Sequence, residues 1–213
     1  MFLTKDNKIK WKLMAVGSAL ALLFVGLGVF WFDKSVFLLM RNFNTPIWRG
    51  FEIVFSFAAW LALSALVFAV AFIVDKFKLK SKLTNVALYV FGAVVGAGGV
   101  AAILRVVLGR MRPVFFLALD KTGFYPGNFE WAFNSMPSGH ATASFAALVM
   151  IGLFFPKWKW ATWTLAIIIG ISRICIGAHW PSDVLLGALI GMIAADLVKH
   201  YLPRILGKIK IKK

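Results

Sequence analysis

Two of the three histidines in this chain, His140 and His179, lie in stretches whose residue types could do chemistry. In the stretch ISRICIGAHWPSD, residues 171–183, His179 and Asp183 are four positions apart and Arg173 precedes them. Pro181 favours a first helical turn that begins between the histidine and the aspartate. On that turn the carboxylate can accept a hydrogen bond from one imidazole nitrogen and leave the other nitrogen as a nucleophile or base. An Arg–Asp pair that only holds two helices together is the structural alternative, and it leaves the histidine unexplained.

The stretch NSMPSGHATASF, residues 134–145, contains the second of these histidines, His140. Pro137 and Ser138 are typical of a helix start, with Ser138 at the N-cap. Amides in a first helical turn have no partner within the helix and lie at its positive end, so they can bind phosphate. Gly139 would let a ligand approach the backbone closely. An ordinary helix start with an interfacial histidine is the alternative, and for this stretch taken alone it is the favoured interpretation.

The third cluster is RVVLGRMRP, which places Arg105, Arg110 and Arg112 within eight positions. A guanidinium group presents a planar fork of donors that matches phosphate oxygens, so the cluster favours an anion site. Arginines that extend towards lipid headgroups are the alternative. Together the three clusters favour a phosphate site in which a histidine is the reactive group.

The composition indicates that the elements holding these clusters lie in a membrane. Of the 213 residues, 61% are hydrophobic, and they include 21 Phe and 9 Trp. Soluble domains are nearer half apolar, so this is the composition of an integral membrane protein. The length allows a single domain, residues 1–213, of about six spans. The single cysteine, Cys175, excludes an internal disulfide framework and a zinc site built from cysteines.

Six apolar segments of spanning or nearly spanning length predict an all-α bundle of six transmembrane helices. Lysines precede the first segment, as in a signal peptide. Its apolar run is too long, however, and no small-residue cleavage site follows, so we expect it to remain in the protein. The predicted spans are Trp11–Phe32, Phe51–Val74, Leu83–Leu104, Ser138–Phe155, Trp158–Cys175 and Pro181–Val198.

The net charge of +16 is distributed in short clusters between the apolar segments. That pattern is typical of membrane topology, so no nucleic-acid partner is expected. Six spans place sixteen of the 24 basic residues on one side, which the positive-inside rule assigns to the cytoplasm together with both termini. The three clusters then lie at the outer ends of the spans. The sixteen residues are Lys5, Lys8, Lys10, Lys12, Lys76, Lys78, Lys80, Lys82, Lys157, Lys159, Lys199, Arg204, Lys208, Lys210, Lys212 and Lys213.

Three segments are assigned to the outer side: residues 33–50, 105–137 and 177–180, with Gly177 as the expected pivot of the last. The stretch DKSVFLLMRNF in the first has Phe and Leu among charges, which favours an interfacial helix, and a plain loop stays open. Residues 115–133 in the second are rich in aromatic side chains, as expected beside the site at headgroup depth, where a lipid enters from the outer leaflet. Solvated loop charges are the favoured interpretation of Asp120, Lys121 and Glu130, ahead of headgroup selection.

The chain resembles the type 2 phosphatidic acid phosphatases, membrane relatives of acid phosphatases and vanadium haloperoxidases. The family's first motif, Lys, six residues and Arg-Pro, corresponds to Arg105 and to Arg112-Pro113. The second motif is complete as Pro-Ser-Gly-His at 137–140, and the third is Ser172-Arg173, His179 and Asp183 with both gaps intact. The departure is Arg105, where the family usually has lysine; the charge is kept, but the donor geometry differs.

The resemblance implies a mechanism that agrees with the chemistry of the residues. His179 would attack phosphorus in line and form a phosphohistidine, while Asp183 orients its ring. His140 would protonate the leaving oxygen and then activate water. No metal or cofactor is implied, because arginines supply the positive charge. The phosphate oxygens would be held by Arg105, Arg112, Ser138, Gly139 and Arg173.

The resemblance also implies a lipid phosphate as substrate, in the cytoplasmic (inner) membrane, with the site facing the periplasm or the outside. Bacterial members act on undecaprenyl pyrophosphate, phosphatidylglycerol phosphate, phosphatidic acid or the phosphates of lipid A, and no residue here separates these lipids. The sequence does not determine the oligomeric state.

Four other functions are compatible with part of the pattern. A lipid phosphotransferase would use the same phosphohistidine with a lipid acceptor in place of water. A metal-dependent phosphatase is disfavoured because clustered arginines repel a divalent ion and carboxylate ligands are scarce. A haloperoxidase is expected to be soluble. A non-catalytic anion-binding membrane protein does not explain three correctly spaced motifs.

Overall fold

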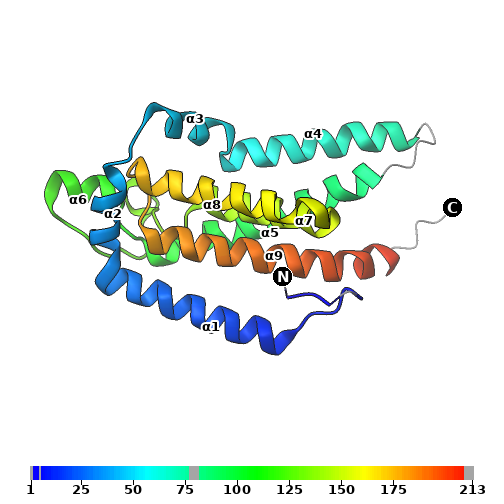
Figure 1. The fold of residues 1–213 in the computed structure, drawn as a ribbon, viewed down its shortest axis with the longest axis horizontal. Coiled ribbons are helices and arrows are strands. Elements are labelled where there is room, and N and C mark those ends of the chain that lie inside the picture. Colours follow the sequence, from blue (N-terminus) through cyan, green and yellow to red (C-terminus); the bar gives the residue numbers. More distant parts are fainter. Residues whose placement is uncertain (1, 5, 77–81, 209–213) are drawn as a thin grey trace.

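The computed structural model describes residues 2–4, 6–76 and 82–208, and these form a bundle of α-helices. Figure 1 shows the long helices running roughly along the longest axis, with the short helices α2 and α6 at one end. The described residues contain no β-strand, only two isolated bridges. The helices are α1 (Trp11–Leu27), α2 (Asp33–Arg41), α3 (Pro46–Val54), α4 (Phe57–Lys76), α5 (Lys82–Leu108), α6 (Pro113–Leu119), α7 (Gly139–Phe154), α8 (Lys159–Cys175) and α9 (Pro181–Lys208).

Each predicted span overlaps one of the six longer helices, α1, α4, α5, α7, α8 and α9. By length and composition, three helical stretches among the described residues can cross a membrane: Trp11–Arg41, Thr84–Leu108 and Pro181–Ile205. The bent pair Pro46–Val54 and Ala58–Val70 makes a fourth if it is one span. Helices α7 and α8 have only 16 and 17 residues. The all-helical class is therefore confirmed, and the count of six spans remains a prediction.

Helix α7 forms the centre of the bundle, where it packs against α5, α8 and α9. Its sequence is rich in small residues, and the side chains of Ala141, Ala143, Ala146 and Ala147 are completely buried. Between helices in a membrane, van der Waals packing of small residues replaces much of the hydrophobic driving force. The alanines let three neighbouring helices approach α7 closely, which fixes the position of its first turn.

Two glycines bring α9 against the backbone of α7. A Cβ atom at Gly187 would lie 2.7 Å from the carbonyl oxygen of Ser138, and one at Gly191 would lie 2.5 Å from that of Thr142. Real Cβ atoms essentially never come this close, so both positions require glycine unless the helices separate. Their spacing of four residues is that of the small-xxx-small packing motif. The contact joins the first turns of α7 and α9, which carry the second and third motifs.

The segment that follows the first predicted span is helical, so the loop alternative is wrong. A π-helical turn, Gly28–Phe32, connects α1 directly to α2. Phe37 of α2 is completely buried, and its ring centroid lies 5.2 Å from that of Trp180, just before α9. Helix α2 therefore packs against the protein as well as presenting exposed residues such as Leu39.

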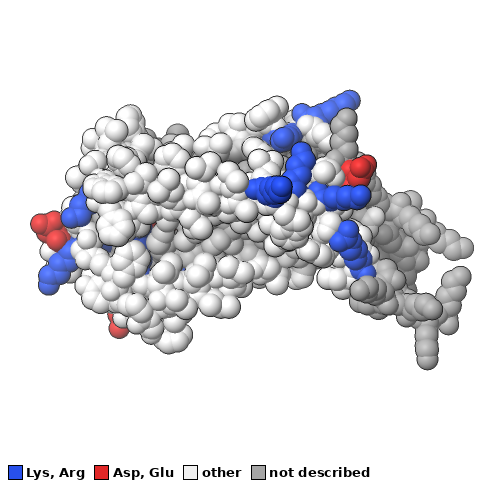
Figure 2. Space-filling view, turned by 90° about the horizontal axis from the view of Figure 1, so that it is seen from below, with Lys and Arg blue, Asp and Glu red and all other residues white. Residues whose placement is uncertain are grey.

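Basic side chains gather at the end of the molecule opposite the short helices α2 and α6, on the face that Figure 2 shows. Figure 2 shows Lys and Arg gathered towards one end, with a broad region of uncharged side chains between them and the charges at the other end. At the basic end, residues near the N-terminus pack on α9: Phe2 is buried, and its amide donates to Asp196 at 2.7 Å. The side-chain amide of Asn7 donates to the carbonyl of Lys199 at 2.8 Å.

Candidate active site

His179 lies in the turn between α8 and α9, with only 2% of its surface exposed. Gly177 forms this turn with a φ of +79°, as expected for the pivot. The Nδ1 atom of His179 lies 2.8 Å from the carbonyl oxygen of Ser135. Because a carbonyl oxygen can only accept, Nδ1 carries the hydrogen and Nε2 keeps its lone pair. That Nε2 atom lies 3.5 Å from Nη1 of Arg112, so it faces the cation cluster.

Burial lowers the pKa of His179 to about 3. The nearby positive charges of Arg112 and Arg173 lower it further, while Asp183 opposes them. The ring is therefore neutral at neutral pH, which is the state in which Nε2 can act as a nucleophile.

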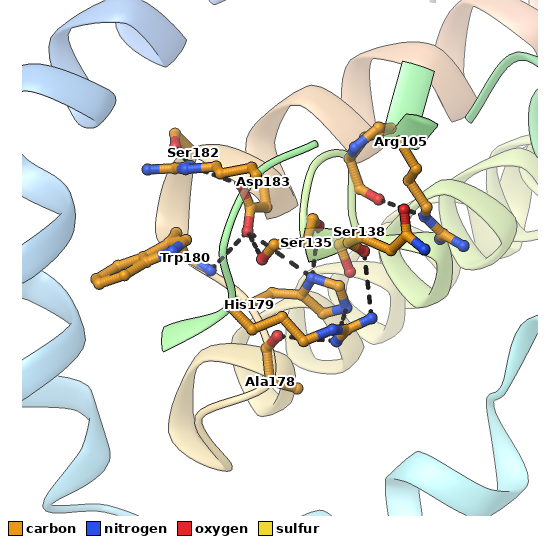
Figure 3. Close-up of polar contacts among 12 residues, drawn as sticks. Arg105, Ser135, Ser138, Ala178, His179, Trp180, Ser182 and Asp183 are labelled. Atoms are coloured by element: carbon orange, nitrogen blue, oxygen red, sulfur yellow. Dashed lines mark hydrogen bonds and ion pairs between the residues drawn. The ribbon is translucent and has the colours of Figure 1, made fainter. Parts of the chain in front are cut away.

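Asp183 lies close to His179 but does not form the predicted direct hydrogen bond. The distance from its Oδ2 atom to Nδ1 of His179 is 3.8 Å. Oδ2 instead accepts from the hydroxyl of Ser135 at 2.5 Å and from the amide of Trp180 at 2.9 Å. The carboxylate folds back over the first turn of α9 to satisfy the Trp180 amide, so Ser135 connects it to the histidine (Figure 3).

His140 lies on the first turn of α7 and lines the same cavity as His179. Its Nε2 atom lies 3.0 Å from the backbone carbonyl oxygen of Glu52 in α3. By the same argument as for His179, Nε2 of His140 carries a hydrogen atom. The Nε2 atom thus keeps a lone pair in His179 and carries a hydrogen atom in His140.

Ser138 occupies the N-cap position of α7, as predicted, but its side chain makes no capping hydrogen bond. Its amide donates to the backbone carbonyl of Asp183 at 3.0 Å. Among the described residues, its buried hydroxyl oxygen has no hydrogen-bond partner. The Ser138 amide is therefore committed to α9, and its hydroxyl is the polar group of this residue that has no partner among the described residues.

Arg105 reaches the α7 start from α5. Its Nε atom donates to the carbonyl of Pro137 at 3.0 Å. A Cβ atom at Gly139 would overlap Nη2 of Arg105, so this position needs glycine to admit the guanidinium. The predicted close approach at Gly139 is thus made by an arginine side chain.

Arg112 is held by three backbone carbonyls. Nε donates to Trp131 at 2.9 Å, Nη1 to Ala178 at 3.0 Å and Nη2 to Asn134 at 3.2 Å. Its guanidinium carbon also lies 4.2 Å from the centroid of the Trp131 ring. Burial lowers the pKa of Arg112 to about 10, which leaves it charged at neutral pH. These contacts fix the guanidinium before any ligand arrives.

Arg173 points inward from α8 and is only 2% exposed. Its partner is Glu52, at 3.0 Å from Nη2, and not Asp183 as in the structural alternative. Within the described part of the chain, its Nε and Nη1 atoms are buried without a hydrogen-bond partner. A buried, unsatisfied guanidinium is costly, so these donors are suited to an incoming anion.

A cavity of about 280 Å³ joins these groups. Six of the eight predicted residues line it, and Asp183 and Ser138 are not among its lining residues. The charges favour an anion, because three guanidinium groups face one carboxylate. The lining residues are Glu52, Arg105, Arg112, Trp131, Gly139, His140, Arg173, Ala178 and His179.

Four residues at or beside the site were not predicted to have a role in it: Asp33, Glu52, Arg110 and Ser135. Arg110, an unassigned arginine of the first cluster, binds Asp183 through Nη1 at 2.6 Å and Asp33 through Nη2 at 2.6 Å. Ser135 bonds both Asp183 and His179, and Glu52 bonds Arg173 and His140. The sequence could have indicated one of these residues, Glu52. A carboxylate at the start of an apolar segment needs an ion-pair or hydrogen-bond partner.

Comparison with known proteins places the chain in a family. Residues 85–206, more than half of the chain, match the family model of the PAP2 superfamily. The lipid A 1-phosphatase of Rhizobium etli is 39% identical over 103 residues, which cover 48% of this chain and 44% of that protein. The undecaprenyl-diphosphatase of Sulfolobus acidocaldarius is 41% identical over 58 residues, which cover 27% of this chain and 28% of that protein. The matched regions are thus less than half the length of these relatives.

The fold is also similar to that of a solved protein. The transmembrane PAP2 type phosphatidylglycerolphosphate phosphatase from Bacillus subtilis superposes with a TM-score of 0.63 at 22% identity, over 94% of this chain and 98% of that one. The range matched by the family model contains all eight predicted site residues, from Arg105 to Asp183. This chain belongs to the PAP2 superfamily.

Proposed function

We propose that this protein is a membrane lipid phosphatase that hydrolyses a phosphomonoester or a diphosphate on a lipid. The observation that carries the proposal is the position of His179, whose Nε2 lone pair faces a cavity lined by three arginines. The functions of the relatives support a lipid phosphate as the substrate class, since they include a lipid A 1-phosphatase and an undecaprenyl-diphosphatase.

The proposed reaction has two steps. In the first, Nε2 of His179 bonds to phosphorus as the bond from phosphorus to the lipid-side oxygen breaks. His140, carrying both ring protons at this stage, delivers one of them to that oxygen and becomes neutral. In the second, water attacks the phosphohistidine, the P–N bond breaks, and His140 accepts the proton of the water. The products are the dephosphorylated lipid and inorganic phosphate.

The arginines stabilise the charge that builds on the phosphoryl oxygens in both steps. Arg105, Arg112 and Arg173 approach the cavity from three different elements, so they can surround a phosphoryl group. Two of the three are anchored by backbone carbonyls, which favours electrostatic stabilisation without reorganisation during the reaction. The hydroxyl of Ser138 would add a neutral donor, and Asp183 would stabilise the positive ring of the phosphohistidine.

We further propose that the protein crosses the cytoplasmic membrane six times as one domain, with both termini in the cytoplasm and the site at the outer face. The distribution of charge supports this arrangement, since Lys and Arg gather at the end opposite the cavity (Figure 2). Short α7 and α8 would then cross with one end below the bilayer surface, which is tolerated for α7 because it packs between α5, α8 and α9.

Phosphate release by the purified protein tests the proposal. A panel of lipid phosphates and diphosphates is incubated with the wild type in the presence of a chelator, and free phosphate and phosphorylated lipids are both measured. His179→Gln is expected to abolish release, and His200→Gln at the opposite end is the matched control. Full activity of His179→Gln would contradict the assignment of the nucleophile, and a phosphorylated acceptor lipid in place of free phosphate would indicate a phosphotransferase.

A further inference from the structure

Arg110 is not among the residues that line the phosphate cavity, and it joins two buried carboxylates. Its Nη1 atom donates to Asp183 and to the hydroxyl of Ser182, each at 2.6 Å, and its Nη2 atom donates to Asp33 at 2.6 Å. All four residues are at most 6% exposed. A buried network in which every charge is paired fixes the orientation of its members more firmly than single surface contacts do.

Asp33 also binds the N-terminus of α9 from another helix. Its Oδ1 atom accepts the amide of Ser182 at 2.9 Å, and its Oδ2 atom accepts the Ser182 hydroxyl at 2.5 Å. The residue before α9 is Trp180, whose side chain cannot cap a helix, so Asp33 supplies an acceptor that the local sequence lacks. A carboxylate at this position is also favoured by the positive end of the helix.

The backbone before Asp33 comes close to the start of α9. The π-helical turn Gly28–Phe32 directly precedes it, and π-helical turns often mark functional positions. A Cβ atom at Gly28 would lie 2.9 Å from the Cβ of Ser182, so the glycine permits the close approach to α9.

From Asp183 the connection continues to the reactive ring. Ser135 donates its hydroxyl to Oδ2 of Asp183, and its carbonyl oxygen accepts from Nδ1 of His179. The amide of Ser135 donates to the carbonyl of Arg110 at 3.0 Å, so the same arginine holds both ends of this link. Figure 3 shows Ser182, Asp183, Ser135 and His179 in this order across the site.

We infer that Asp33 and Arg110 are positioning residues, which hold Asp183 and Ser135 so that Nε2 of His179 points at phosphorus. The inference rests on the proposed function, because an effect of these residues on kcat requires that the protein is a phosphatase. Asp33 lies outside the range of the family match, 85–206, and Arg110 lies within the six-residue gap of the first motif. Two carboxylates and one guanidinium leave one negative charge beside His179. That charge balances the positive ring that forms when Nε2 bonds to phosphorus.

Kinetics of Asp33→Asn test this inference. The variant keeps the size of the side chain and removes its charge, so kcat is expected to fall about 10-fold or more, while KM stays within about 2-fold because the cavity arginines are unchanged. Arg110→Lys keeps the charge but cannot span both carboxylates, so part of kcat is expected to return relative to Arg110→Met. Asp6→Asn, an exposed carboxylate at the opposite end, is the matched control. An unchanged kcat in Asp33→Asn would overturn the inference.

A second measurement does not depend on activity. The chain has only three histidines, so protein labelled with ¹⁵N-histidine gives few ring signals, and His179→Gln identifies that of His179. In Asp33→Asn the Nδ1 signal of His179 is expected to shift or broaden, while that of His200 stays in place and reports that the protein is folded. The same shift or broadening is expected for Ser135→Ala. This variant provides the measurement if Asp33→Asn does not fold.

The two measurements separate the inference from the proposed function. If the wild type releases no phosphate from any lipid, the proposed function fails, and the ring signal alone decides the inference. An Nδ1 signal that is identical in the wild type, Asp33→Asn and Ser135→Ala would overturn it. A lower melting temperature with unchanged kcat and unchanged Nδ1 signal would also overturn it, because it would assign Asp33 a structural role only.

Discussion

At the residue scale, the protonation state of His179 decides which chemistry the cavity supports. The ring is buried beside cations, so burial lowers its pKa to about 3. Arg110 shows the opposite behaviour: Asp183 and Asp33 raise its pKa despite its burial. A neutral ring thus stands between cations that remain charged, and it gains a positive charge only when Nε2 bonds to another atom.

The lowered pKa of His179 predicts a pH-dependent stability. An unfolded histidine has a pKa of about 6.5, so below that pH the unfolded chain binds a proton that the folded chain does not. The contribution of this residue is therefore complete above about pH 6.5 and is lost as the pH falls towards 3, by at most about 1.4 kcal/mol per pH unit. Thermal unfolding in detergent between pH 7 and pH 4 should show a smaller decrease for His179→Gln than for the wild type. Equal slopes would contradict the shift.

Glu52 is predicted to compete with the phosphate. Its carboxylate bonds Arg173 inside the cavity and is itself 46% exposed, so an incoming anion must displace it or share the arginine with it. Glu52→Gln should lower the inhibition constant of inorganic phosphate by about 3- to 10-fold, a modest effect because a half-exposed pair is screened by solvent. Glu130→Gln, an exposed carboxylate outside the cavity lining, is the control. Weaker phosphate binding in Glu52→Gln would instead indicate that Glu52 positions Arg173.

The sequence predicted those site residues whose relation is local or defined by a spaced motif. His179 and Asp183 share one turn, and Ser138, Gly139 and His140 are adjacent, so spacing alone brings them together. The partners supplied by distant elements were missed, because nothing in the spacing shows that Asp33 or Glu52 approaches α9 or α8. The predicted pairing of His179 with Asp183 is present only as an approach of 3.8 Å without a hydrogen bond, because Ser135, from the loop before α7, donates its hydroxyl to Asp183 and accepts from Nδ1 of His179 at its carbonyl.

At the element scale, α7 and α9 behave as one unit. Backbone contacts at Gly187 and Gly191 place Ser138, the start of α7, beside Asp183, the start of α9, and the Ser138 amide donates to the Asp183 carbonyl. The first turns of both helices therefore move together. This unit carries His140 and Asp183 and holds the turn of His179, so its rigidity sets the precision of the site.

Gly191→Ala is predicted to disturb this unit. The new methyl group would meet backbone atoms of α7, which cannot rotate away as a side chain can, so the helices must separate at a cost of about 1–3 kcal/mol. Gly99→Ala in α5 is the matched control, because a Cβ atom there has no neighbour within 4 Å. The melting temperature in detergent should fall for Gly191→Ala and stay level or rise for Gly99→Ala. Equal changes in the two variants would contradict the packing argument.

The helices themselves followed closely from the apolar segments. The start of α9 at Pro181 and the end of α8 at Cys175 agree with the predicted bounds, because proline and the turn glycine mark both positions. The continuation of α1 through a π-helical turn into α2 was not predicted. The periodicity of apolar residues cannot reveal such a turn. The turn precedes Asp33, whose contact is with a helix about 150 residues later in the chain.

At the scale of the whole molecule, the two ends differ in charge and in chemistry. The cavity lies where α7 begins and α8 ends. The Lys and Arg side chains in Figure 2 gather towards the other end of the molecule. If the positive-inside rule orients the bundle, the proposed substrate comes from the outer leaflet. In the same orientation, the residues near the N-terminus of the chain that pack on α9 lie on the cytoplasmic side.

Cysteine labelling tests this orientation. Cys175 is buried, and its replacement by Ala leaves a chain without cysteine, to which single cysteines are added at Asp120 and at Asp6. In intact cells a membrane-impermeant maleimide should label the Asp120→Cys protein and not the Asp6→Cys protein, and permeabilised cells should label both. Labelling of Asp6→Cys alone in intact cells would reverse the proposed orientation.

The shortness of α7 has a consequence for the bilayer around the protein. At 1.5 Å per residue its 16 residues extend over about 24 Å, whereas a typical hydrocarbon core is about 30 Å thick. If the far end of α7 lies at the cytoplasmic boundary, its first turn lies about 6 Å inside the outer one. The phosphate of a bound lipid would then leave the plane of its neighbours and move inward, and water needed for the second step would have to follow it. We therefore expect a local depression of the outer leaflet at this site, and faster turnover in thinner bilayers.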